Sequence, residues 1–352
     1  MLTGMAHQFR VREIAAQAGL SEATVDRVLH RRGGVRASTV DEVQQAIADL
    51  GRQRSQLRLA GRTFMVDVVV QAPGRFSAAV QAALEAELPS LRPAVIRSRF
   101  HRYPGASAPA LATGLRRIAR TGSHGVILKA PDLPAVVDAV ARLTEARIPV
   151  VTLVTDLPAT GRVAYVGLDN RAAGATAAYL LGQWLGERPG DILVVRGRGS
   201  FRQEDEREMG FRGTLRESSP PRAQIDVVDD EDQAGAVGVS VRAALAAHPG
   251  IRAVYSMYAG AGGNAAVLDA FAALGRDCDA FIAHDLDGEN AVLLPQHRLT
   301  AVLQHDLRHD LRRACQVIMQ AQGALPGPIA ALPSTVQIIT PYNVPPALFP
   351  PD

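Results

Sequence analysis

Residues 14–35 read IAAQAGLSEATVDRVLHRRGGV. The residues from about 11 to 17 favour a short helix, and Gly19 can adopt the left-handed conformation that a tight turn between helices requires. Ser21 is a good N-cap for a second helix, because its hydroxyl can accept a hydrogen bond from a backbone N–H two or three residues later. Two short helices joined by a glycine turn predict a helix-turn-helix, whose second helix enters the DNA major groove.

A third helix is expected after the loop at residues 31–34. It would begin at Ser38, with Asp41 three residues later completing a capping box. Its core side is expected to consist of Val40, Val43, Ile47 and Leu50, which recur at helical spacing. The sequence therefore predicts a three-helix headpiece over residues 10–51, preceded by a disordered tail over residues 1–9.

The positive charge of the chain is concentrated at its N-terminal end. Residues 1–63 contain ten arginines and six acidic residues, an excess of +4, whereas the other 289 residues carry −1. Such a basic segment is typical of a nucleic-acid-binding headpiece, although a solvated basic surface without a partner has the same composition.

The string at residues 14–35 resembles the headpiece of the lactose-repressor (LacI) family, whose pattern is I-A-x-x-A-G-[VL]-S-x-x-T-V-x-R-V-L. An unrelated three-helix bundle is the alternative, but it would not require this pattern. The matching positions are Ile14, Ala15, Ala18, Gly19, Leu20, Ser21, Thr24, Val25, Arg27, Val28 and Leu29.

The resemblance implies which residues contact DNA. Glu22 and Ala23 match the family's main base-reading pair, Arg27 matches its base-reading arginine, and Thr24 would contact phosphate. Together with the capping residue Ser21, these are the candidate DNA-binding residues of the helix-turn-helix. Two acids depart from the family's usual pattern, at Glu22 and at Asp26, and we expect them to change the operator sequence without abolishing binding.

Residues 52–63 are expected to link the headpiece to the body. The family usually has a hinge helix here, from which a leucine inserts into the minor groove. The segment lacks the family's Pro-Asn pair, but its last residues fit the end of the family's hinge pattern. Leu59 is therefore the candidate for the inserting leucine, which we call the wedge, and Leu57 is the alternative. An arginine-rich linker that orders only on DNA is the other interpretation.

From residue 64 onward, short apolar runs alternate with helical stretches, which indicates βαβ units and parallel sheets. Ten such runs over about 280 residues exceed one ordinary sheet and favour two α/β lobes. The expected strands are Met65–Val70, Ala94–Arg97, Gly125–Leu128, Val150–Val154, Asp191–Val195, Ile225–Val228, Ala253–Met257, Ala280–Ala283, Thr300–Leu303 and Val336–Ile339.

This order resembles the type I periplasmic-binding-protein fold, the effector domain of the same repressor family. The resemblance covers residues 64–345 and implies that the chain crosses between lobes near residues 167, 304 and 327. The N-lobe would then hold about 64–166 and 304–326, and the C-lobe about 167–303 and 327–345. The ligand would bind between the lobes, at the carboxyl ends of the strands.

The resemblance also implies the ligand-binding residues. Phe76 matches an aromatic residue that packs on a sugar ring, and Arg207 matches the arginine of an R-x-x-G-F motif. Two carboxylates are expected to bind hydroxyls, although Asp156 is shifted by about two positions from the family's acid. The complete set of candidates is Phe76, Asp156, Arg207, Tyr258, Asn264, Asp285 and Gln304, with Tyr258 and Asn264 as alternatives for one position.

These residues suit a small sugar or polyol, because each hydroxyl can donate to a carboxylate and accept from an arginine. A purine or nucleoside is the alternative ligand. We find no phosphate-binding loop, no nucleophile elbow and no convincing metal site, although His305 and His309 lie four apart. We therefore expect no catalysis, cofactor or metal.

The sequence thus predicts a ligand-responsive repressor that binds a palindromic operator as a homodimer, with higher oligomers left open. A cytoplasmic location is expected, because two cysteines form no disulfide framework and no apolar run could span a membrane or serve as a signal peptide. A solute-binding protein and an α/β enzyme with a fused helical domain are the two rival classes.

Overall fold

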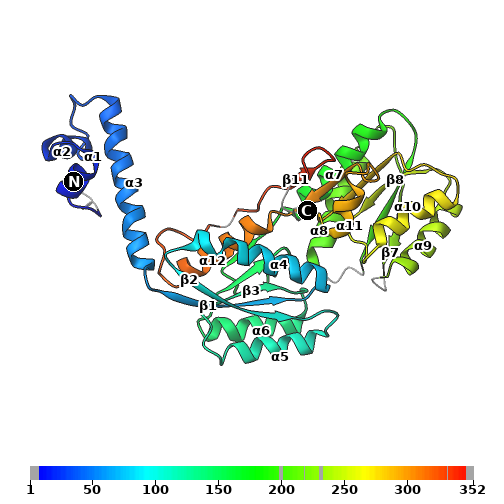
Figure 1. The fold of residues 1–352 in the computed structure, drawn as a ribbon, viewed down its shortest axis with the longest axis horizontal. Coiled ribbons are helices and arrows are strands. Elements are labelled where there is room, and N and C mark those ends of the chain that lie inside the picture. Colours follow the sequence, from blue (N-terminus) through cyan, green and yellow to red (C-terminus); the bar gives the residue numbers. More distant parts are fainter. Residues whose placement is uncertain (1–7, 198–200, 218, 230–232, 331, 346–352) are drawn as a thin grey trace, which may run out of the picture.

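The computed structural model describes residues 8–197, 201–217, 219–229, 233–330 and 332–345. Figure 1 shows a small helical headpiece, one long helix leading away from it, and two α/β lobes in succession. The predicted fold class is confirmed: a three-helix headpiece precedes two lobes, each built on a mainly parallel sheet.

The headpiece consists of α1 (Val11–Ala18), α2 (Glu22–Leu29) and the N-terminal part of α3 (Ala37–Leu59). Gly19 ends α1 with φ of 67°, the left-handed conformation that the turn requires. Phe9 is buried in the headpiece core, so our prediction that it belongs to a disordered tail over residues 1–9 is wrong. Residues 1–7 of the predicted tail lie outside the described part of the chain. The core residues are Phe9, Ile14, Ala15, Val25, Val43 and Ala46.

The third helix differs from the prediction at both ends. It begins at Ala37 with Arg36 as the N-cap, and no side chain caps it, so the capping box expected from Ser38 does not form. It also continues to Leu59 without a break. The segment that we expected to be a separate linker from residue 52 is therefore largely the C-terminal part of this helix (Figure 1).

The N-lobe contains a five-stranded sheet in the order β2-β1-β3-β4-β5. In Figure 1, α4 and α12 lie on one face and α5 and α6 on the other. β5 was not predicted from the sequence, because it has only three residues. The elements are β1 (Thr63–Val70), α4 (Gly74–Glu87), a 3-10 turn (Leu88–Leu91), β2 (Val95–Arg102), α5 (Ala108–Ile118), β3 (Gly125–Lys129), α6 (Pro134–Glu145), β4 (Val150–Leu153), β5 (Ala164–Val166) and α12 (Leu307–Ala321).

The C-lobe contains a six-stranded sheet in the order β11-β10-β9-β8-β6-β7. Its last strand pairs antiparallel with β10, an exception to the parallel arrangement that we expected. Apolar side chains pack both faces of the sheet. The elements are α7 (Asn170–Leu185), β6 (Asp191–Arg196), α8 (Arg202–Arg216), β7 (Gln224–Val228), α9 (Ala234–Ala247), β8 (Ile251–Ser256), α10 (Gly263–Ala273), β9 (Ala280–His284), α11 (Gly288–Leu293), β10 (Ala301–Gln304) and β11 (Gln337–Ile339).

The chain passes between the lobes three times. It leaves the N-lobe after β5, returns after β10 to form α12, and reaches the C-lobe sheet again at β11. Leu168 and Ser334 form an isolated bridge that joins the first and third of these segments. In the described part of the chain, no helix is both long and apolar enough to cross a membrane.

Candidate functional site

The second headpiece helix carries the predicted base-reading residues on its outer surface. Ser21 caps α2, because the backbone N–H of Thr24 donates to the Ser21 hydroxyl with 3.2 Å between the two heavy atoms. Glu22, Ala23 and Arg27 are all exposed on the same short helix. The predicted N-cap is therefore confirmed, and the three side chains are accessible to a partner.

Asp26 is the acid that we expected to repel DNA phosphates. Its carboxylate accepts a hydrogen bond from Arg32 Nη1 at 2.8 Å, and His30 Nδ1 lies 3.0 Å from its other oxygen. Because Arg32 pairs with this negative charge within the headpiece, we expect Asp26 to repel DNA phosphates less than its sequence position suggests.

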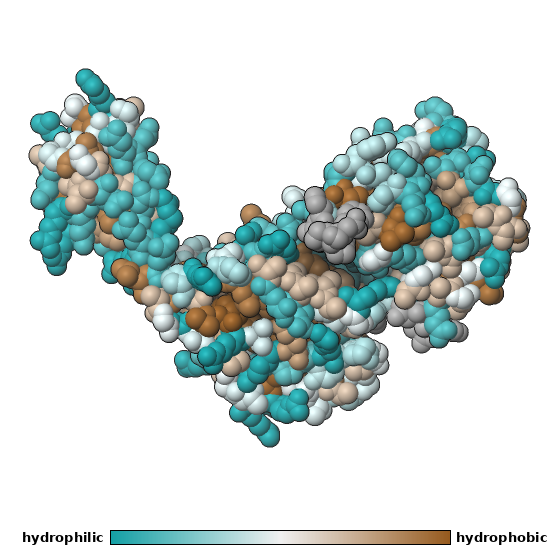
Figure 2. All heavy atoms as spheres, viewed as in Figure 1, coloured by the Kyte–Doolittle hydropathy of each residue, from teal (hydrophilic) through white to brown (hydrophobic). Residues whose placement is uncertain are grey.

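The C-terminal half of α3 presents a basic surface. Figure 2 shows hydrophilic atoms along much of the visible face of this helix. A groove where α3 meets the N-lobe is lined by several arginines, among them Arg52, Arg54, Arg58 and Arg92. Such a groove attracts phosphate groups without regard to base sequence.

The two candidate wedge leucines lie in different environments. Leu59 is only 6% exposed and packs into the N-lobe core with Phe64 and Val66. It is therefore not available for insertion into DNA in this structure, and its assignment as the wedge is corrected. Leu57, the alternative, is 77% exposed two residues earlier on α3.

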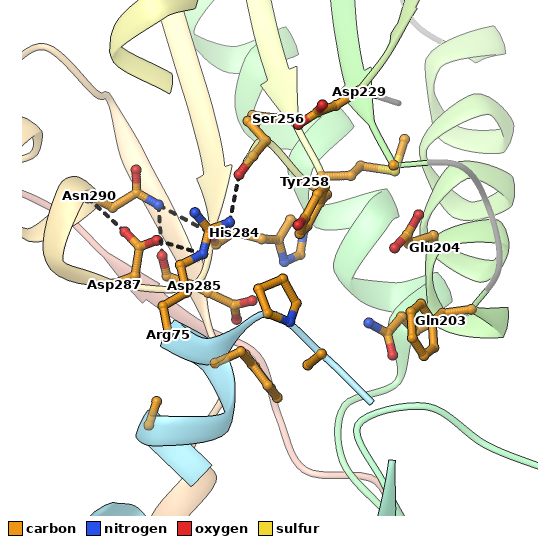
Figure 3. A pocket seen from close by; sticks show the side chains of 18 of the residues that line it. Arg75, Gln203, Glu204, Asp229, Ser256, Tyr258, His284, Asp285, Asp287 and Asn290 are labelled. Carbon is orange, nitrogen blue, oxygen red and sulfur yellow. Dashed lines mark hydrogen bonds and ion pairs between the residues drawn. The ribbon is translucent and has the colours of Figure 1, made fainter. Parts of the chain in front are cut away.

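A cavity of about 430 Å³ lies between the two lobes, at the carboxyl ends of their strands. Its volume is within the range of small-molecule sites. Figure 3 shows side chains from both lobes converging on this space. Six of the seven ligand-binding residues predicted from the sequence line it: Phe76, Arg207, Tyr258, Asn264, Asp285 and Gln304.

Asp156 is the exception. Its carboxylate accepts hydrogen bonds from Arg162, from the Thr152 hydroxyl at 2.8 Å and from the backbone N–H of Leu157 at 2.8 Å. It is not among the residues that line the cavity. The structure therefore corrects this assignment: Asp156 stabilises the loop after β4, consistent with its two-position shift from the family's acid.

Arg207 is the most deeply buried charge of the cavity wall, with 2% of the residue exposed. Its Nε donates to Asn170 Oδ1 at 3.0 Å, and its Nη2 lies 2.8 Å from His305 Nε2. Burial and the positive charge of Arg207 hold the pKa of His305 well below its usual value, so this imidazole is neutral and accepts the hydrogen bond.

Close helix packing positions Arg207. A β-carbon on Gly174 of α7 would lie 1.9 Å from the Arg207 carbonyl oxygen, and one on Gly210 of α8 would lie 1.9 Å from the Arg171 carbonyl oxygen. Only glycine fits at either position. These two glycines therefore allow α7 and α8 to approach each other, which brings Arg207 to Asn170.

Asp285 follows β9 and enters the cavity from the C-lobe. Its φ of 61° is unusual for a residue other than glycine, and such strain is common at binding sites. Burial raises the pKa of its carboxyl, while Arg207, Lys129 and Arg75 act in the opposite direction. Asp285 thus feels the charges of three cations without a close ion pair to any of them, and its carboxylate lines the cavity in a position to accept hydrogen bonds from a ligand.

Two amide side chains complete the C-lobe wall. Asn264 Nδ2 donates to Asn290 Oδ1 at 2.8 Å, whereas Asn264 Oδ1 is buried without a hydrogen-bond partner among the described residues. Gln304 Oε1 accepts from the backbone N–H of Leu286 at 2.6 Å. Asn264 can therefore accept from a ligand hydroxyl, and Gln304 can donate through its free amide group.

Several cavity residues were missed in the sequence. Arg75, Lys129 and Glu204 contribute charges, and His284 contributes a buried imidazole. His305 does not line the cavity, but its Nε2 lies 3.8 Å from Asp285 Oδ1. His305 precedes α12 and bonds Arg207, so it does not share a helix face with His309. The sequence alone could have drawn attention to Lys129, because it is the single lysine of the chain.

The chemistry of the cavity is that of polar recognition. Carboxylates, amides and cations surround aromatic side chains from both lobes, Phe76 and Tyr258 among them. No group of three His, Cys, Asp or Glu residues that could hold a metal ion occurs in the described ranges. The arrangement suits a small ligand rich in hydroxyl groups.

Comparisons with known families agree with this architecture. Residues 10–54 match the model of bacterial regulatory proteins of the lacI family, and residues 57–323 match a periplasmic binding protein domain. The second match covers well over half of the chain. A search of the curated proteins found no match.

Solved structures share the fold of the body. GanP, a glucose-galactose binding protein from Geobacillus stearothermophilus, is 19% identical with a TM-score of 0.69, over 81% of this chain and 99% of its own. A solute-binding protein from Burkholderia graminis, in complex with D-arabinose, is 18% identical with a TM-score of 0.70, over 81% and 97%. A protein from Bacteroides fragilis assigned as a LacI transcriptional regulator is 16% identical with a TM-score of 0.68, over 80% and 98%.

The helix-turn-helix, the two lobes with the cavity between them and the two matching family models lead to one assignment. The chain belongs to the lacI family of bacterial regulatory proteins, with a periplasmic binding protein domain as its body.

Proposed function

We propose that this protein is a transcriptional repressor that binds operator DNA and responds to a small sugar or polyol in the cavity between its lobes. The observation that carries the proposal is the combination of an exposed candidate base-reading surface on α2 with a cavity between the lobes that is lined by charged and amide side chains, in the same chain. The sugar-binding proteins that share the fold of the body support the ligand class.

The DNA-binding part of the proposal assigns base contacts to Glu22, Ala23 and Arg27 on α2. A helix in the major groove reads about half of a short site, so a homodimer would read two half-sites of a palindromic operator. The basic groove at the end of α3 would add phosphate contacts. A protein that binds chromosomal DNA would act in the cytoplasm, which is the location that we propose.

The ligand-binding part assigns Phe76 to an apolar face of the ligand and assigns Arg207, Asn264, Asp285 and Gln304 to its hydroxyl groups. Ligand binding would change the relative positions of the lobes and hence of the attached headpieces. Such coupling between the two sites is reciprocal. A ligand that releases the protein from DNA must bind the DNA-free protein more tightly than it binds the DNA-bound protein.

The test begins with operator selection from random duplexes by the full-length chain, followed by fluorescence anisotropy on the selected site. Sugars, polyols and purines are then screened by thermal unfolding, since a ligand at 100 times its Kd adds about 2.7 kcal/mol of stability. We expect a stabilising sugar or polyol to release the DNA. A chain that selects no sequence, or that releases DNA only with purines, would contradict the proposal.

A further inference from the structure

Lys129 is unusual both in the sequence and in its position. The chain has 38 basic residues, and all of them except Lys129 are arginines. The one lysine stands at the end of β3, lines the cavity between the lobes, and is only 5% exposed. A buried lysine is costly and uncommon unless its charge is paired, so its position calls for a physical explanation.

The surroundings of Lys129 do not pair its charge directly. Its Nζ lies 3.8 Å from the centre of the Phe201 ring and 5.4 Å from that of Phe76, and it donates to the Gln71 carbonyl at 3.4 Å. Among the residues that the structure describes, no carboxylate oxygen lies within 4 Å of this ammonium group. Glu204 and Asp285 act on it from a greater distance.

Arg207 is a second buried cation of the same kind. It bonds an amide oxygen of Asn170 and the neutral imidazole of His305. Within the described ranges, it too has no carboxylate oxygen within 4 Å. Lys129 and Arg207 both line the same cavity, and the positive charge of Arg207 contributes to the lowered pKa of Lys129. Arg75 differs from both, because Asp287 lies 3.6 Å from its Nε.

Two buried cations that repel each other and lack a close carboxylate destabilise the ligand-free cavity. An anionic group on the ligand would compensate both. We propose that the cavity takes a polyhydroxylated ligand that carries one anionic group, a carboxylate or a phosphate, and that Lys129 binds this group with Arg207 as the second cation.

This inference rests on the proposed ligand-responsive function and narrows its ligand class to acidic sugars. The carboxylate of Asp285 and the amides of Asn264 and Gln304 remain available for the hydroxyl groups of such a ligand. Lysine suits the role because its ammonium group is compact and fits between two aromatic rings, where the planar guanidinium of arginine needs more room.

The first experiment compares matched ligands on the full-length chain by calorimetry. Each pair has the same ring or chain with and without the acid: glucose with glucuronate, galactose with galacturonate, and glucose with glucose 6-phosphate. We expect the acidic member of at least one pair to bind at least about tenfold more tightly, as a charge-assisted hydrogen bond would provide. The uronate and phosphate arms distinguish the two sources of the anionic group.

The matched variants are Lys129→Met, which keeps most of the apolar stem, and Arg97→Met, which removes an exposed positive charge from the same lobe. Lys129→Met should lower the affinity for the acidic ligand at least about tenfold and that for the neutral ligand less than about threefold. Arg97→Met should leave both affinities unchanged. Equal weakening of both ligands by Lys129→Met would make Lys129 a structural residue and overturn the proposal.

A spectroscopic measurement keeps the test independent of the variants. Selective labelling with [ε-13C]lysine gives one lysine NMR signal, because the chain contains one lysine. Binding of the acidic ligand should move the titration midpoint of this signal upward. The proposal fails if a neutral sugar binds more tightly than its acid, or if no acidic probe at millimolar concentration shifts the signal. The proposed function fails separately, if the chain binds no operator.

Discussion

Arg75, at the first turn of α4 in the N-lobe, donates from Nη2 to the carbonyl oxygen of Ala259 in the C-lobe, with 2.7 Å between the two atoms. The same guanidinium lies 3.6 Å from Asp287 and 5.7 Å from the centre of the Tyr258 ring. One side chain of the N-lobe therefore contacts three residues of the C-lobe across the cavity.

Arg75→Ala should shift the ligand-free protein toward a more open arrangement of its lobes, because these contacts disappear. Small-angle X-ray scattering should show an increased radius of gyration for the variant. Arg116→Ala removes an arginine from the outer surface of α5 and serves as the matched control. An unchanged scattering curve for Arg75→Ala would mean that the hinge segments alone set the lobe arrangement.

Arg27→Ala should weaken operator binding by roughly 1–3 kcal/mol and relax specificity at one base pair, because a bidentate contact to guanine would be lost. Fluorescence anisotropy on single-base variants of the operator would measure both effects. If Arg27 instead contacts phosphate, the loss would be the same on every sequence and the salt dependence would become less steep.

Leu57→Ala and Leu59→Ala should have opposite effects, because one side chain is exposed and the other is buried. Leu59→Ala should lower the free energy of unfolding by about 2–5 kcal/mol, as expected for a cavity in a core. Leu57→Ala should leave stability nearly unchanged and weaken specific DNA binding. Chemical denaturation and anisotropy on both variants would test this, and a reversed pattern would restore Leu59 as the wedge.

Asp285→Asn should raise the ligand concentration needed for DNA release at least about tenfold, since a charged acceptor becomes a neutral amide. The raised pKa of Asp285 also predicts that ligand binding weakens at a higher pH than for an ordinary aspartate as the solution is acidified. Calorimetry from neutral to acidic pH would check this. The exposed substitution Asp269→Asn is the control, and equal affinities in both variants would contradict the role of Asp285.

Lys129→Met should raise the Tm of the ligand-free protein at neutral pH. Burial lowers the pKa of Lys129 from 10.5 to about 8, with Glu204 and Asp285 opposing this and Arg207 adding to it. The charged lysine therefore destabilises the fold below about pH 8, by up to ~3 kcal/mol, and this cost disappears as the pH rises toward 10.5. Denaturation curves at several pH values should show the advantage of the variant shrinking over this range.

The family motifs predicted the headpiece and six residues of the cavity wall. Ser21 and Gly19 act through local capping and turn geometry, which a sequence pattern expresses directly. Asp285 and Gln304 follow predicted strands, and parallel strands bring their carboxyl ends to one edge. The strand boundaries therefore indicated the edge of the sheet at which these residues lie, whereas their assignment to the ligand came from the family resemblance.

Other features depend on tertiary contacts that no local pattern expresses. Asp156 was misplaced because Arg162, six residues later, takes up its carboxylate. Leu59 was misassigned because the burial of a helix end depends on the sheet that it meets. Arg75 and Lys129 were missed because their importance comes from the opposite lobe, where Ala259 and Phe201 lie.

The unbroken course of α3, with Leu59 buried in the N-lobe, makes this helix a lever arm. Twenty-three residues at 1.5 Å each give a length of about 34 Å. A tilt of about 10° at the N-lobe end would displace the far end by about 6 Å, more than the 3.4 Å rise of one base pair. A small rotation of the N-lobe is thus amplified into a shift of the recognition helix by more than a full step along the operator.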